Sequence, residues 1–182
     1  MENNVNPWKA NLTNGLILGL IGIVYTMVFY FLDLTTNRLQ GWVFLLILIV
    51  ILFLLVKSFR DNYRYGLITF GQAFGAGMII FLYYAIISAV FAYILYAIID
   101  PNLIDKQLAF TEGEMMKRGL PQEAVDMSMS MQRKIMKPAI MAPISIFGNM
   151  FYGLIMSLIV AAFVRKEGNP LVDAPVTEPE NE

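Results

Sequence analysis

One stretch constrains this chain more than any other, because the residues from Gly71 to Ile99 include no charged side chain. In the core of a bilayer there is no water to satisfy backbone N–H and C=O groups, so a lone segment must pair them internally as a helix. Crossing the hydrocarbon takes about 20 apolar residues. The sequence therefore predicts a transmembrane helix over 71–99.

The rest of the chain repeats this pattern, since 58% of its 182 residues are hydrophobic and only 15% are charged. The apolar residues occur in four long continuous runs, which predict an all-α, polytopic membrane protein with four transmembrane helices. The first run is too long for a cleaved leader, so we expect it to stay as a helix. The expected spans are 12–32, 41–56, 71–99 and 139–164 within a domain over 12–165, after a polar segment at 1–11 and before an acidic tail at 166–182 that we expect to be disordered.

Small residues spaced by four occur in three of the four runs, and this spacing allows two helix backbones to approach closely. Such pairs also arise in generic packing between membrane helices, so they do not by themselves indicate a specific dimer surface. The helix-packing candidates are Gly15, Gly19, Gly71, Gly75, Gly153, Ser157 and Ala161. The run 41–56 has no small residue after Gly41, so we expect its helix to be the most lipid-exposed, outside a core made by the other three.

The segment 100–138 is the longest connection and contains helical signals of its own. Thr111 and Glu114 fit a capping box, which predicts a short helix ending near Arg118. Pro121 suits the first position of a second, amphipathic helix. Its predicted apolar face consists of Leu120, Ala124, Met127, Met131 and Ile135. This face suits a groove for a partner or lipid, or a helix that lies on the membrane or caps the bundle.

Basic residues flank two of the runs and bear on orientation. Lys57, Arg60 and Arg64 are membrane-surface candidates, which serve either to bind anionic headgroups or simply as a topology signal. Together with basic residues at 165–166 they favour a cytoplasmic N-terminus and C-terminus. The basic residues at 133–137 argue for the opposite orientation.

The sequence lacks the side chains that most often serve in catalysis, metal binding and proton transfer. The chain has no Cys and no His, and no ionisable side chain lies inside a predicted span. We therefore expect no enzyme activity, no proton coupling, no cofactor and no metal site. The amides Asn14, Gln72 and Asn149 are expected to form interhelical hydrogen bonds.

Acidic side chains gather at the start of the segment 100–138. Asp100, Asp105, Glu112 and Glu114 could bind a cation, but their spacing fits no known loop. Solvated acids and helix caps are the simpler interpretation.

The stretch YRYGLITFGQAFGAG at 63–77, the tyrosine-rich third run ending in Ile99–Pro101, and the long connection after it resemble a known family. The family is catalogued as domain of unknown function 4199. The resemblance covers about residues 10–165 and implies a four-helix domain in the bacterial inner membrane. It implies no activity and no residue roles.

Two function classes agree with the sequence. The first is a non-enzymatic scaffold, accessory or lipid-interacting membrane protein, whose partners are membrane lipids, other membrane proteins or a second copy of itself. The alternative is a small oligomeric transporter or channel for a neutral or apolar solute. A net charge of −1 gives no indication of nucleic-acid binding. A polar cavity inside the bundle would favour the transporter, and a filled interior the first class.

Overall fold

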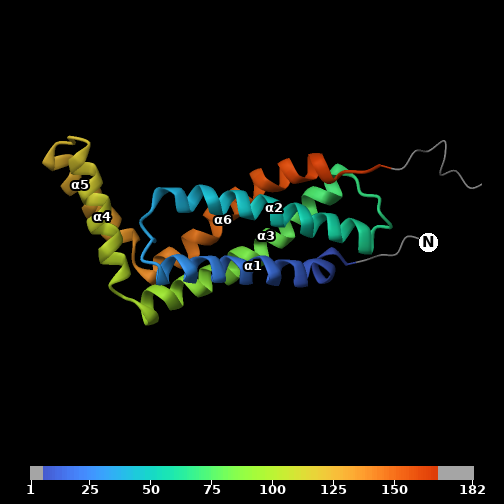
Figure 1. Cartoon of the computed structure of the whole chain (residues 1–182), viewed down its shortest axis with the longest axis horizontal. Helices are drawn as coiled ribbons and strands as arrows, with labels where there is room; N and C mark the ends of the chain where they lie inside the picture. The colour runs from blue at the N-terminus through green and yellow to red at the C-terminus, as the bar shows by residue number, and fades with distance from the viewer. Residues whose placement is uncertain (1–5, 168–182) are drawn as a thin grey trace, which may run out of the picture.

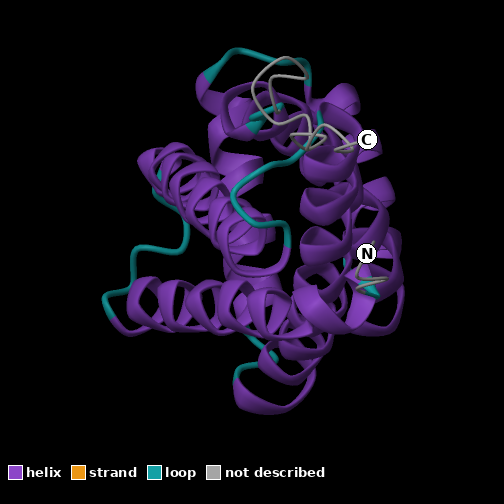
Figure 2. Ribbon diagram, turned by 90° about the vertical axis from the view of Figure 1, so that its right-hand side faces the viewer, coloured by secondary structure: helices purple, strands orange, loops and turns teal. Residues whose placement is uncertain are grey.

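The computed structural model describes residues 6–167, apart from the side chain of Arg38, and this part of the chain is helical with short connections (Figure 2). The elements are α1 (Pro7–Phe31), α2 (Arg38–Tyr63), α3 (Phe70–Ile94) with a π-helical extension η1 (Leu95–Ile99), α4 (Leu103–Lys117), α5 (Gln122–Ile135) and α6 (Pro138–Val164). Helices α1, α2, α3 with η1, and α6 are long and apolar enough to cross a membrane. The prediction of an all-α fold with four such helices is confirmed. The predicted tail at 166–182 lies almost entirely outside the described residues.

The four long helices form an elongated bundle, and α4 and α5 form a hairpin that projects from one end of it (Figure 1). Helix α3 is central, packing most extensively against α6 and next against α1. The start of α1 and the end of α6 lie at the end opposite the hairpin (Figure 1). We call these the terminal end and the hairpin end of the bundle.

Two helix boundaries differ from the sequence predictions. Helix α1 begins at Pro7, where the side chain of Asn6 caps it by accepting a hydrogen bond from the backbone N–H of Trp8, 3.0 Å away. Helix α2 continues to Tyr63, and its 26 residues measure about 39 Å at ~1.5 Å per residue. The predicted end at residue 56 was wrong because a charge stops the apolar run without stopping the helix, and Lys and Arg are good helix formers.

Helix α2 packs on its neighbours less extensively than the other three long helices do. The share of buried residues in its most apolar window is 22%, as in α1 and α6, against 33% in α3. Leu52, Val56 and Phe59 are buried, although the run 41–56 has no small residue of its own after Gly41. The predicted core of α1, α3 and α6, with α2 on its outside, therefore agrees with the packing, although α2 buries as large a share of its apolar window as α1 and α6 do.

The hairpin of α4 and α5 differs from its prediction in two respects. Thr111 lies in the middle of a continuous α4, where its hydroxyl donates to the carbonyl of Gln107 at 2.9 Å, so there is no capping box. The hairpin has its own small core of Leu108, Val125 and Met129. The predicted apolar face of α5 does not cap the bundle, since Leu120, Met127, Met131 and Ile135 are all exposed, and its contact with a partner or with lipid stays a prediction. The apolar surface of α5 extends over two faces, and α4 covers the face that carries Val125 and Met129.

Asp100 joins the hairpin to the bundle. Its carboxylate accepts hydrogen bonds from the Tyr30 hydroxyl at 3.4 Å and the Asn102 backbone N–H at 3.1 Å, and it pairs with the Lys106 ammonium at 3.5 Å. The side-chain amide of Gln107 donates to Tyr96 at 3.1 Å beside it. Asp100 is thus used in anchoring, and within residues 6–167 no three acidic side chains gather closely enough to hold a metal.

Candidate functional site

Helix α2 is held to different neighbours at its two ends. Near the hairpin end the Tyr25 ring stacks on Phe44 with centroids 4.6 Å apart, and its hydroxyl donates to the carbonyl of Gln40 at 2.7 Å. Near the terminal end the guanidinium of Arg60 donates to the carbonyl of Val164 at 3.1 Å. The first half of α2 is therefore fastened to α1 and the second half to α6.

A pocket lies where the first half of α2 faces α3 and α6. Its volume is ≈ 500 Å³, within the range of about 300–1,000 Å³ that is usual for small-molecule sites. It is lined by Gly41, Trp42, Phe44, Leu45 and Leu48 of α2, Phe81 and Tyr84 of α3, and Asn149 and Tyr152 of α6. From Leu48 onward the same face of α2 is buried, so the pocket is a local opening in an otherwise filled core.

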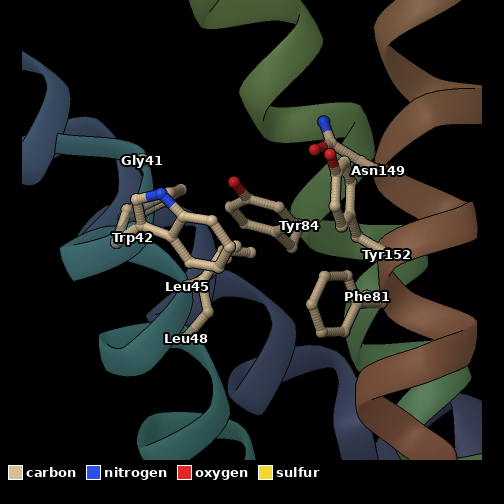
Figure 3. A pocket seen from close by; sticks show the side chains of 9 residues that line it. Gly41, Trp42, Leu45, Leu48, Phe81, Tyr84, Asn149 and Tyr152 are labelled. Carbon is tan, nitrogen blue, oxygen red and sulfur yellow. The ribbon is translucent and has the colours of Figure 1, made fainter. Parts of the chain in front are cut away.

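The pocket has mostly apolar walls and a few polar groups. Figure 3 shows Trp42 and Tyr152 on opposite sides, with the ring of Tyr84 between them. The polar ends of Tyr84, Tyr152 and Asn149 lie toward one end of the pocket, and Leu48 and Phe81 toward the other (Figure 3). This arrangement suits a molecule with one polar and one apolar end.

Asn149 is the most informative of these groups. Its side chain forms no hydrogen bond with any residue in the described part of the chain. An amide without a partner in an apolar environment costs roughly 1–3 kcal/mol. The side-chain amide of Asn149 can therefore donate hydrogen bonds to a molecule in the pocket and accept them from it.

The family model described as "Protein of unknown function (DUF4199)" matches residues 13–166. The chain belongs to this family. The matched region takes in α1 from residue 13 onward, the other three long helices and the hairpin, so the pocket lies inside the DUF4199 domain. No match was found among the curated proteins or among the solved structures.

The other two predicted amides of this DUF4199 domain bond locally and not between helices. Gln72 completes a capping box at the start of α3: its side-chain oxygen accepts from the Thr69 N–H at 3.2 Å, and its own N–H donates to the Thr69 hydroxyl at 3.4 Å. Asn14 donates to Asn11 one turn away on α1, at 3.2 Å. The expectation of interhelical hydrogen bonds from these three amides was therefore wrong.

The helix-packing candidates divide into two groups. A Cβ at Gly153 would lie 2.6 Å from the ring of Phe81, and one at Gly19 would lie 2.7 Å from Ile87. The positions at closely packed or fully buried contacts are Gly15, Gly19, Gly153, Ser157 and Ala161. A Cβ at Gly71 or Gly75 would meet no atom within 4 Å, so these two glycines lie away from helix contacts. Gly77, which is two residues further along, makes the close contact of α3, against Ser157.

The membrane-surface candidates lie together at the terminal end of α2. Lys57 is exposed, while Arg60 and Arg64 are half-buried. Sequence reasoning missed the pocket on the other half of this helix. Asn149 and Trp42 were its visible signals, but the spacing of residues within α2 does not show that its first half leans toward α1.

Proposed function

We propose that this DUF4199 protein is a non-enzymatic, lipid-interacting membrane protein that holds an amphipathic molecule of the membrane in the pocket between α2, α3 and α6. The observation that carries the proposal is the unpartnered amide of Asn149 in a pocket with apolar walls. A ligand with a polar group near Asn149 and an apolar chain along Leu48 and Phe81 would satisfy both surfaces.

A binding role is favoured over conduction by the packing beside the pocket. Leu52, Ile80 and Ala161 are fully buried in the adjoining core, so the pocket is set to one side of a filled interior. A scaffold or accessory role fits the same packing. An enzyme is disfavoured because the sequence has neither His nor Cys and no ionisable side chain lines the pocket, apart from the Tyr hydroxyls.

We further propose that the protein resides in the bacterial inner membrane with both termini in the cytoplasm. The support for this orientation is the density of basic residues at the terminal end of α2 and α6. Membrane lipids are its proposed partners, and other membrane proteins or a second copy of the chain are further candidates.

The pocket is tested by photocrosslinking the full chain in nanodiscs that contain phosphatidylcholine with a photoreactive acyl chain. We expect labelled peptides to concentrate at 41–48 and 149–152. Leu45→Trp, which fills the pocket, should lower this labelling several-fold. Leu46→Trp is the matched control, because Leu46 is 67% exposed and does not line the pocket.

Two results would contradict the proposal. Labelling spread evenly over all exposed helix faces would mean that the pocket holds no preferred molecule. Flux of a neutral solute from liposomes, abolished by Asn149→Leu, would favour the transporter in its place.

A further inference from the structure

A second groove lies along the seam between α2 and α6, nearer the terminal end. It has a volume of ≈ 240 Å³ and is lined only by apolar side chains. These are Ile49, Val50 and Phe53 of α2 and Ile159, Val160 and Phe163 of α6. The groove is distinct from the pocket at Asn149, with which it shares no residue.

Basic side chains continue the α2 wall of this groove. Lys57 and Arg60 follow Phe53 by four and seven residues, so all three lie on one face of the helix. Lys57 is exposed one turn beyond Phe53. Arg60 spans the end of the groove, because its guanidinium donates to the carbonyl of Val164 at the end of α6.

The α6 wall also ends in basic residues, and their position is fixed by backbone hydrogen bonds. The N–H of Ile68 donates to the carbonyl of Lys166 at 2.8 Å, and the N–H of Lys166 donates to the carbonyl of Ile68 at 2.9 Å. Lys166 also lies close enough to Asp61 for electrostatic interaction, as do Lys57 and Arg60. Lysines from α2 and from the end of α6 thus lie at the same end of the bundle.

This cluster carries an excess of positive charge. Residues 57–67 and 165–167 contain five basic and two acidic side chains. Asp61 is engaged by Arg60, with 2.7 Å between the carboxylate oxygen and Nε. Lys57 and Lys166 form no ion pair with any residue in the described part of the chain. Two ammonium groups are therefore available at the terminal end of the bundle: that of Lys57, one turn beyond Phe53 of the groove, and that of Lys166, three residues beyond Phe163.

We infer that the groove and this cluster form a binding site for one anionic phospholipid. An acyl chain would lie against Phe53, Ile159 and Phe163, and the phosphate would be held by Lys57 and Lys166. The charge complementarity selects an anionic headgroup, and the apolar groove leading away from the lysines selects a lipid over free phosphate. The ends of α2 and α6 are also where headgroups meet a protein that spans the bilayer.

The test is native mass spectrometry of the full chain in detergent, titrated with dioleoyl phosphatidylglycerol and, separately, with dioleoyl phosphatidylcholine. We expect tighter binding of the phosphatidylglycerol. Each of Lys57→Gln and Lys166→Gln should weaken it about fivefold, as follows from about 1 kcal/mol per basic residue near a membrane surface. Both side chains are exposed, so the variants should fold.

Matched controls distinguish the contribution of the lipid headgroup from that of the acyl chain. The single variant Lys134→Gln removes the same charge from the hairpin and should leave phosphatidylglycerol binding unchanged. Ile159→Trp fills the groove and should weaken binding, whereas Leu158→Trp should not; the two residues are 41% and 42% exposed, and only Ile159 lines the groove.

Three outcomes would overturn the inference. These are equal binding of the two lipids, equal loss in the hairpin control, and full competition by inorganic phosphate at the same concentration. Leu45→Trp, which closes the pocket of the proposed function, should leave phosphatidylglycerol binding intact. A result against the phospholipid site at the groove can therefore be distinguished from a result against the pocket at Asn149.

Discussion

At the scale of single residues, glycines on the same helix have different surroundings. Gly153 lies against the ring of Phe81, whereas Gly148 on the same helix has no atom within 4 Å of a Cβ position. Likewise Gly77 lies against Ser157, and Gly75 faces open space. Spacing places residues on one helix face, but the rotation of the helix in the bundle decides whether that face meets a neighbour.

Substitutions at the two α6 glycines should therefore differ in their effect on stability. Gly153→Ala should destabilise the bundle by about 1–3 kcal/mol, because the new methyl group overlaps Phe81. Gly148→Ala should be neutral or stabilising by up to ~1 kcal/mol, since Ala favours the helix more than Gly does. Unfolding in mixed detergent monitored by circular dichroism measures both. Equal destabilisation would mean that α6 does not pack on α3 through Gly153.

Asn149 leads to a prediction in which stability and binding change in opposite directions. Asn149→Leu should stabilise the empty protein by about 1 kcal/mol, because it removes an unpartnered amide from an apolar pocket. It should also lower photolabelling of the pocket. Gln72→Leu is the contrasting case, since it removes the capping box of α3 and should destabilise by about 0.5–2 kcal/mol. A loss of stability in Asn149→Leu would indicate a hydrogen-bond partner for the amide within the protein.

At the scale of elements, periodicity predicted which segments are helical but not where each helix ends or which face it buries. Charges beyond residue 56 ended the apolar run without ending α2. In the hairpin, the apolar surface of α5 is wide enough to offer two faces, and only contact with α4 selects the one at Val125 and Met129. The pocket could not be predicted for a similar reason. It depends on Tyr25 holding the first half of α2 against α1, which is a contact between helices.

The hairpin offers a direct test of which face of α5 is buried within the protein. Val125 is fully buried and Met127 is 71% exposed. Val125→Ala should cost about 1–3 kcal/mol of local stability, whereas Met127→Ala should cost less than about 0.5 kcal/mol. Hydrogen exchange of the backbone amides in 103–135 measures local opening. If Met127→Ala gave the larger increase in exchange, the face predicted from the sequence would be the buried one.

At the scale of the whole molecule, the bundle separates two chemically different ends. The terminal end carries the basic residues of α2 and α6 close to the helix ends, joined by the exchange of hydrogen bonds between Ile68 and Lys166. The hairpin end carries its basic residues mainly on α4 and α5, which extend beyond the bundle (Figure 1). Basic residues in short links near helix ends weigh most in setting orientation. We therefore predict that the terminal end is cytoplasmic and that the hairpin lies on the opposite side.

Labelling of single cysteines tests this orientation cleanly, because the chain has no cysteine of its own. Arg118→Cys places a thiol at the tip of the hairpin, and Glu167→Cys places one at the terminal end; both positions are exposed. In right-side-out membrane vesicles, a membrane-impermeant maleimide should react at 118 and not at 167, and inverted vesicles should give the reverse. The opposite pattern would show that the termini lie outside. Reaction at both positions in the same vesicles would contradict the fold itself, because the four long helices place these two ends on opposite sides of the membrane.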